Sequence, residues 1–221
     1  METGATLVSG LPRQKPRLRG VSHQLAAFIA VPAVVALWMG AQGFAASLGV
    51  AIYGLSLLAL FTISALFHRP TWKPRARDLV GRLDQATIFV FIAGTYTPFG
   101  LLLGPAGHTL LVLIWVGALG GVILSLLWPT APKPLMATIY VLFGWSFAAL
   151  VPSLFRATGS TVLILILLGA VAYTGGAVIY ALRRPDPFPR IFGYHEIFHL
   201  LVVLAAVFHF AAISMALPSV V

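Results

Sequence analysis

The sequence predicts an all-α membrane protein, a bundle of seven transmembrane helices, and three observations lead to this fold class. Hydrophobic residues make up 60% of the 221 residues and charged residues only 9%, a composition outside the range of soluble globular domains. The apolar residues come in runs of about 20 without alternation, the length that an α-helix needs to cross a bilayer. Within the bilayer the backbone must satisfy its own hydrogen bonds, so helices are expected in each run.

The apolar runs place the helices in order. They cover about 23–42, 47–67, 83–103, 109–128, 135–152, 161–182 and 194–217. The first run is too long for the core of a signal peptide, so we expect an uncleaved helix. A basic loop is expected over 69–82, which puts Asp84 in the first turn of the third helix, where the helix dipole favours an acid. Residues 1–20 form a basic cytoplasmic arm, and residues 21–221 form the transmembrane domain.

The basic residues predict the orientation. Thirteen of the 14 Lys and Arg residues fall in the arm and in alternate loops: Arg13, Lys15, Arg17, Arg19, Arg69, Lys73, Arg75, Arg77, Arg82, Lys133, Arg183, Arg184 and Arg190. Only Arg156 falls on the other side. Because Lys and Arg in short loops prefer the cytoplasm, the N-terminus is predicted inside and the C-terminus outside. The net charge of +9 then reflects topology and contact with anionic lipids, and it gives no reason to expect nucleic acid. The chain has no cysteine and hence no thiolate ligand.

The last apolar run opens with a candidate metal-binding pair. His195 and His199 are four positions apart, so a helix presents both imidazoles on one face. The pattern His-Glu-x-x-His is typical of zinc metalloproteases, in which the glutamate, here Glu196, is the general base. No acid follows Glu196, and His209 lies roughly 15 Å further along the axis, too far to share the ion. A third ligand must come from another helix, unless the pair consists of uncoordinated histidines at the membrane interface.

The predicted topology supplies that ligand. It brings to one membrane level the histidines and acid at the cytoplasmic helix ends: His23, His68, Asp84 and His195. His68 is therefore the predicted third ligand, and three histidines leave the open fourth position of a catalytic zinc site. Ser64 lies one turn before His68 on the same face. Its hydroxyl can bond a water molecule or a substrate carbonyl, or else its own helix.

Four segments carry a family resemblance: residues 64–68 (SALFH), 83–84 (LD), 92–99 (IAGTYTPF) and 192–199 (FGYHEIFH). Together they resemble the hemolysin III family, the bacterial branch of the progestin and adipoQ receptors, over about residues 17–213. That family implies an intramembrane zinc ion held by His68, His195 and His199. Phe67 and Gln85 stand where many members have tyrosine and histidine, and neither position is a ligand.

Alkaline ceramidases are similar in their serine, aspartate and histidine constellation, which implies zinc-dependent hydrolysis of a lipid amide. Asp84 and Ser64 are then the catalytic candidates. Asp84 acts either as general base toward water or as an orienting partner of a histidine, and Ser64 donates to the substrate carbonyl. The receptor branch commonly replaces the acid at the position of Glu196, which argues against the metalloprotease role. His23 stays outside the predicted ligand set.

Three functions compete on this pattern. The first is a zinc hydrolase acting on a lipid amide or ester that enters from the bilayer, and the second is a receptor-like or membrane-homeostasis regulator with structural zinc. The third is an oligomeric pore-forming hemolysin. The sequence disfavours a monomeric pore, because 109–128, 135–152 and 161–182 contain no Asp, Glu, Lys, Arg or His to line a polar path. All three place the chain in the cell membrane as a multi-pass protein with lipids or lipid-like molecules as partners. The role of His209, a polar group within the membrane, is open between a site residue and a partner of a neighbouring helix.

Overall fold

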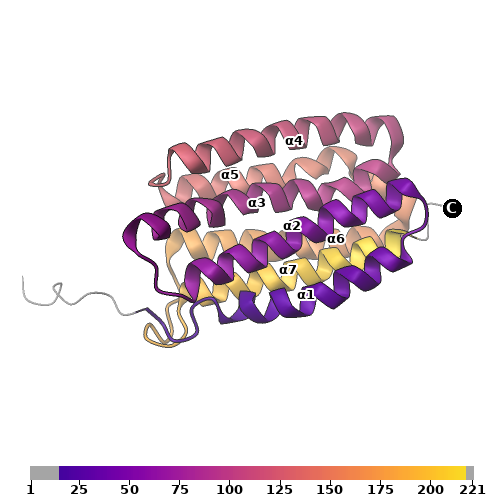
Figure 1. Cartoon of the computed structure of the whole chain (residues 1–221). Helices are drawn as coiled ribbons and strands as arrows, with labels where there is room; N and C mark the ends of the chain where they lie inside the picture. Colours follow the sequence, from indigo (N-terminus) through magenta and orange to yellow (C-terminus); the bar gives the residue numbers. More distant parts are fainter. Residues whose placement is uncertain (1–14, 218–221) are drawn as a thin grey trace, which may run out of the picture.

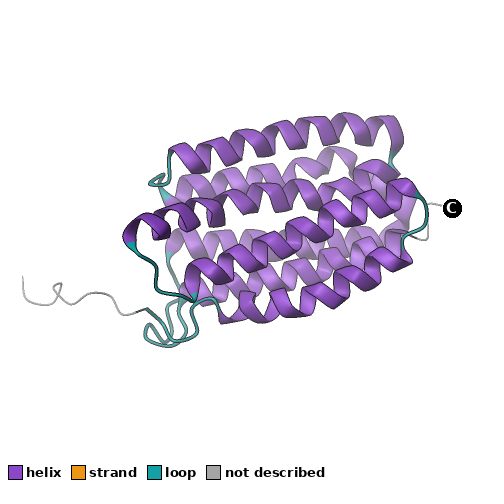
Figure 2. Ribbon diagram, in the orientation of Figure 1, coloured by secondary structure: helices purple, strands orange, loops and turns teal. Residues whose placement is uncertain are grey.

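The computed structural model describes residues 15–217, and over this range the fold is a bundle of long helices (Figures 1 and 2). The helices are α1 Val21–Gly40, α2 Phe44–His68, α3 Pro74–Leu102, α4 Gly104–Leu127, α5 Lys133–Trp145, the 3-10 helix η1 Ser146–Leu150, α6 Val151–Leu182 and α7 Tyr194–Ala216. Most of the predicted basic arm, Arg13 included, lies outside the described residues.

The all-helical membrane class is confirmed. Within the described residues, six helical segments are long and apolar enough to cross a membrane, with 133–182 taken as one continuous segment. The chain is thus a multi-pass membrane protein, while seven crossings and the orientation of the termini stay predictions. Gly159, with φ 80° and ψ −177°, interrupts α6, and Trp145 Nε1 donates to Thr174 Oγ1 over 2.9 Å. The part of α6 after Gly159 therefore lies beside the end of α5.

The predicted start of the third helix is wrong. Residues 74–82, predicted as a basic loop, form the first turns of α3, which begins at Pro74. Proline suits the first helical position because its φ is preset and its missing N–H is not needed there. Hydropathy detects only the apolar part of a helix, which here begins at about residue 83. The helix itself extends past that part into polar surroundings, so its start at Pro74 was missed. Asp84 therefore lies about ten residues into α3, and the helix dipole gives no reason for an acid there.

The basic loops gather at one end of the bundle. The Lys15 ammonium donates to the Arg69 carbonyl over 2.9 Å, and the Arg17 N–H donates to the Arg190 carbonyl over 3.1 Å. These bonds join the arm to the loops after α2 and after α6, while the C-terminal end of α7 lies at the opposite end of the bundle (Figure 1). The grouping that the charge pattern predicted for the arm and these two loops is thus present in the fold.

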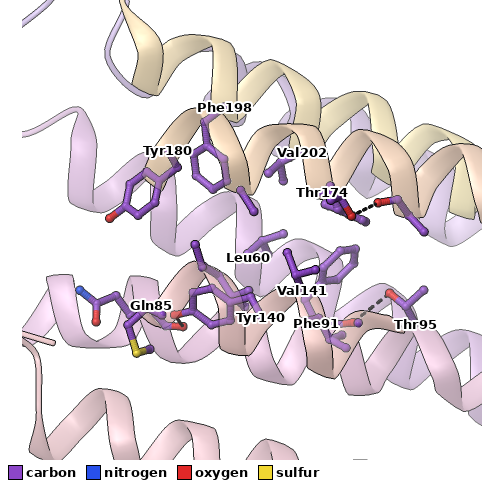
Figure 3. A pocket seen from close by; sticks show the side chains of 18 of the residues that line it. Leu60, Gln85, Phe91, Thr95, Tyr140, Val141, Thr174, Tyr180, Phe198 and Val202 are labelled. Atoms are coloured by element: carbon purple, nitrogen blue, oxygen red, sulfur yellow. Dashed lines mark hydrogen bonds between the residues drawn. The ribbon is translucent and has the colours of Figure 1, made fainter. Parts of the chain in front are cut away.

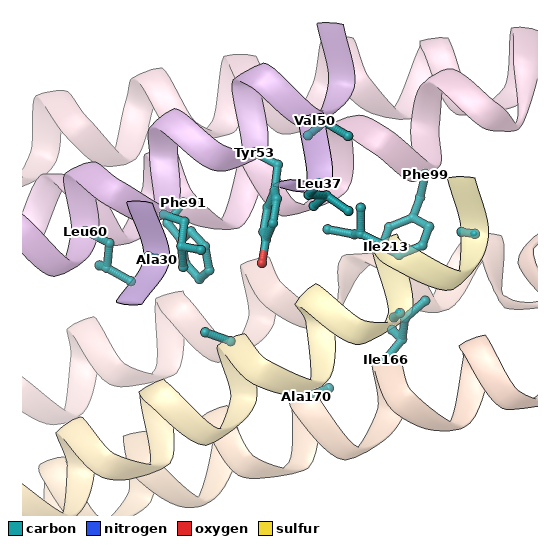
Figure 4. Packing of buried hydrophobic residues seen from close by; sticks show 14 of the residues in the cluster. Ala30, Leu37, Val50, Tyr53, Leu60, Phe91, Phe99, Ile166, Ala170 and Ile213 are labelled. Carbon is teal, nitrogen blue, oxygen red and sulfur yellow. The ribbon is translucent and has the colours of Figure 1, made fainter. Parts of the chain in front are cut away.

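Apolar packing between α2, α3, α6 and α7 forms the core. Val50, Tyr53 and Ile213 are completely buried, and Figure 4 shows them with Phe91 between the helices. α3 packs between α2 and α4 and also contacts α5 and α7. This position sets Asp84 against the ends of α2 and α7.

Candidate metal centre

Three histidines from two helices converge at the end of the bundle where the basic loops lie. His68, the last residue of α2, meets His195 and His199 in the first turns of α7, and each offers a ring nitrogen within 4.8 Å of the other two. All three are buried. The α-helical spacing of four residues puts the α7 pair on one face, and α2 ends at the same depth. The sequence-predicted ligand set is therefore brought together.

The donor set fits a zinc ion. His195 Nε2 and His68 Nε2 are 3.1 Å apart, while nitrogens bound about 2.0–2.1 Å from a tetrahedral zinc ion lie roughly 3.3 Å from each other. The Nδ1 atoms of His195 and His199 are buried without a partner among the described residues. An ion bound at Nε2 would not pair with Nδ1 of the same ring, so the feature that fits a metal site is the convergence of one ring nitrogen from each histidine.

Asp84 and Ser64 lie beside the three histidines. Asp84 Oδ2 is 3.7 Å from His68 Nε2, and Asp84 and Ser64 line the same cavity as His195 and His199. Ser64 comes from α2, one turn before His68, and Asp84 comes from α3. Both candidates that the sequence proposed for catalysis thus lie at the site, although Asp84 reaches it from inside a helix and not from a helix start.

His23 contacts the site without joining its ligand nitrogens. Its ring stacks on that of His199, with centroids 3.9 Å apart and planes 7° from parallel. Both ring nitrogens of His23 are buried and have no partner among the described residues. The sequence left His23 outside the ligand set, and the stacking on His199 could not be found from spacing because the two residues lie on helices at opposite ends of the chain.

The Glu196 carboxylate forms an ion pair with an arginine and a hydrogen bond with the backbone, and it is not paired with any of the three histidines. Its carboxylate pairs with the Arg19 guanidinium, and its Oε2 accepts a hydrogen bond from the Gly193 N–H over 2.8 Å. Glu196 is only 3% exposed, so the guanidinium compensates a buried charge. These partners occupy the Glu196 carboxylate, which argues against the general-base role that is typical of the His-Glu-x-x-His pattern.

The arm covers the site from the end where the basic loops lie. Gly20 has φ 78°, and a side chain at this position would meet the His68 Cβ at 2.6 Å. Glycine therefore allows both the left-handed turn and the close approach of the arm to a candidate ligand. Partial burial and the neighbouring Arg69, Arg77 and Arg19 lower the pKa of Lys15, which reflects how densely positive charge is packed in this cover.

We expect the Arg19–Glu196 pair to hold the arm in place. Arg19→Met should lower the free energy of unfolding by about 3 kcal/mol or more, because it leaves a buried carboxylate unpaired. The double variant with Glu196→Gln should lose less than the two single variants together. Denaturant titration of the purified protein in detergent measures all three, and strictly additive losses would contradict a direct interaction.

An apolar cavity extends from the three histidines into the bundle. It has a volume of about 490 Å³, within the range of ligand pockets, and His195, His199, Ser64 and Asp84 line one part of it. Figure 3 shows Tyr140 from α5 facing Tyr180 and Phe198 from α6 and α7 across this space. The lining is otherwise mostly aliphatic and aromatic. No periodicity in the sequence indicated this cavity, because residues from α1, α2, α3, α5, η1, α6 and α7 form its wall.

Comparisons with known proteins identify the family. The family model described as haemolysin-III related matches residues 12–210. Hemolysin-3 homolog from Bacillus subtilis is 31% identical over 188 residues, which cover 83% of this chain and 85% of that protein. Hemolysin-3 from Bacillus cereus is 31% identical over 205 residues, 90% of both chains. Human monocyte to macrophage differentiation factor is 33% identical over 168 residues, 73% of this chain and 67% of that protein. The chain therefore belongs to the haemolysin-III-related family.

Proposed function

We propose that this protein is a zinc-dependent hydrolase of an amide or ester bond in a lipid, with zinc held by His68, His195 and His199. One observation carries the proposal: three buried imidazoles and a carboxylate lie together, and two of the imidazoles, those of His195 and His199, line an apolar cavity with the carboxylate. The imidazoles suit a metal ion, the carboxylate suits proton transfer, and the cavity suits an apolar chain.

The side chains divide the chemical work. When bound, a zinc ion supplies a Lewis acid that polarises a carbonyl group and makes a nearby water molecule more acidic. Asp84 accepts the proton of the water molecule that attacks the scissile carbonyl carbon, and Ser64 donates a hydrogen bond to the carbonyl oxygen. Asp84 then returns the proton to the leaving nitrogen or oxygen as the C–N or C–O bond breaks, which releases the fatty acid and the amine or alcohol. The apolar wall, which includes Leu60, Phe198 and Val202, holds the acyl chain and keeps bulk water away from it.

The position of Asp84 favours proton transfer over an orienting role. A carboxylate that orients a metal-bound histidine hydrogen-bonds the ring nitrogen remote from the metal. Asp84 Oδ2 instead approaches His68 Nε2 at 3.7 Å, and this is the same nitrogen that lies 3.1 Å from His195 Nε2. The carboxylate thus faces the side of His68 on which the ligand nitrogens converge, where a water molecule and a substrate carbonyl would meet.

A pore is suggested, for those proteins, by the names of the two Bacillus relatives. A pore within one chain would need a polar path across the membrane. However, α4, α5 and the part of α6 after Gly159 carry no charged side chain within the apolar runs.

A regulator with structural zinc would use the same histidines and the same cavity. The hydrolase is favoured over the regulator because Asp84 and Ser64 add a proton acceptor and a donor that a structural metal site does not need.

The test uses the purified protein in liposomes, once loaded with zinc and once treated with a chelator. The substrates are an N-acyl lipid and the ester with the same acyl chain, and release of the fatty acid is measured together with leakage of an enclosed dye. We expect release from at least one substrate that stops on chelation and returns with added zinc, without leakage. Zinc-loaded protein that releases no acid supports the regulator, and dye leakage that survives chelation supports the pore.

A further inference from the structure

A second group of polar atoms lies buried in the apolar interior, remote from the three histidines. The Tyr53 and Tyr173 hydroxyls and His209 Nδ1 are completely covered and have no hydrogen-bond partner among the described residues. His209 is ten residues beyond His199 on α7, hence roughly 15 Å deeper along the helix axis. Because most buried polar groups are paired, three unpaired atoms in one region call for an occupant that pairs with them.

The three side chains are linked by ring contacts. Tyr173 lies against His209, with ring centroids 5.5 Å apart. Phe91 contacts both tyrosines, with centroid distances of 6.2 Å to Tyr53 and 6.3 Å to Tyr173. Figure 4 shows the Tyr53 hydroxyl pointing inward from α2 amid apolar side chains. Tyr173, His209 and Phe91 line the same cavity that reaches His195 and His199.

The hydrogen bond between His209 and α6 determines which nitrogen of the ring carries the proton. His209 Nε2 lies 3.2 Å from the Ile166 carbonyl oxygen. A carbonyl oxygen can only accept, so Nε2 carries the proton and Nδ1 is a bare acceptor. The tyrosine hydroxyls remain able to donate. An occupant that satisfies both must donate to His209 and accept from tyrosine, which a hydroxyl group does and a carboxylate, an ether or a carbonyl group does not.

Contacts with α6 fix the position of the His209 ring. Gly169 on α6 faces it, and any side chain at Gly169 would overlap the imidazole ring. The small residue therefore makes room for His209 against α6, where the Ile166 carbonyl fixes its ring. A histidine held in this way keeps Nδ1 aimed in one direction, as a recognition site requires.

We propose that Tyr173 and His209 form a hydroxyl-binding subsite at the inner end of the cavity, whose lining contains both residues. The ligand is then a lipid with a hydroxyl group roughly 15 Å from the group that lies at the three histidines. This inference rests on the proposed function, which places the reacting head group of the lipid at His68, His195 and His199. The new element is a hydroxyl group on the apolar chain of that lipid.

The experiment measures binding and needs no turnover. Zinc-loaded protein in detergent is saturated with a fluorescent fatty acid, which is displaced by hexadecanoic acid and by a series of its monohydroxy derivatives with the hydroxyl moved along the chain. We expect the parent acid to bind and the best-placed derivative to bind about tenfold more tightly, since it gains two buried hydrogen bonds. The preference should peak at one hydroxyl position.

Two conservative variants make the result specific. Tyr173→Phe removes only the unpaired hydroxyl, so it should leave the melting temperature unchanged or higher and should abolish most of the preference. Tyr140→Phe is the matched control, because Tyr140 also lines the cavity but its hydroxyl already donates to the Gln85 carbonyl. It should keep the preference.

The outcomes separate this inference from the proposed function. If the parent acid binds and no hydroxyl position improves binding, the buried polar atoms pair with water molecules and the hydroxyl-binding subsite is refuted. The proposal that the cavity binds a lipid is not affected by that result. If neither the parent acid nor any derivative displaces the fluorescent acid, the lipid cavity itself fails and the subsite fails with it. A preference that survives Tyr173→Phe would also refute the assignment.

Discussion

Replacing Asp84 by asparagine is expected to slow hydrolysis of a lipid amide by roughly 10²-fold or more, the usual contribution of a general base. Asparagine keeps the size of the side chain and its place next to His68, but it cannot take a proton. The zinc content should stay that of the wild type, because Asp84 is not among the three converging ligand residues. Fatty acid release and elemental analysis on the same sample measure both quantities.

Asp78→Asn is the matched control for this variant. Asp78 lies on α3 as well but is exposed, so its replacement should leave both activity and zinc unchanged. An Asp84→Asn protein that loses zinc along with activity would show instead that the carboxylate orients or binds the metal site. Full activity in that variant would remove Asp84 from the mechanism.

Replacing His68 by alanine is expected to reduce zinc from about one ion per chain to near zero. The two remaining histidines come from one helix, and two neutral imidazoles do not complete a zinc site. The loss should appear after purification and dialysis, by elemental analysis against protein concentration. Activity should fall with the zinc.

His108→Ala serves as the control for His68→Ala. His108 is an exposed histidine in α4 and takes no part in the cluster, so this variant should keep its zinc. Retention of full zinc by His68→Ala would exclude the three-histidine assignment, and it would bring back a site made of His195, Glu196 and His199 despite the pairing of Glu196 with Arg19.

Much of the site could be predicted from the sequence because it depends on helix periodicity and on the depth of helix ends. The spacing of His195 and His199 fixes their common face, and the apolar run that ends at His68 fixes its level. The structure brings these three residues together as predicted. The start of α3 could not be predicted in the same way, because residues 74–82 are polar and helical at once.

The remaining features depend on tertiary contacts that leave no local pattern. Arg19 and Glu196 are 177 residues apart, and nothing in the spacing of either residue pairs them. The stacking of His23 on His199 and the buried hydroxyls of Tyr53 and Tyr173 follow from how α1, α2, α6 and α7 pack. Aromatic residues of this kind are common in membrane helices, so the sequence alone assigns them to the apolar core or to the membrane interface.

The proposed hydrolase requires a zinc ion held by His68, His195 and His199. The most direct test is zinc X-ray absorption on the purified wild-type protein, whose spectrum reports the number and kind of ligands. We expect about one zinc ion per chain, with imidazole scattering from three histidines and ligand distances of about 2.0–2.1 Å. Protein without stoichiometric zinc, or a spectrum with fewer than three imidazoles, would contradict it.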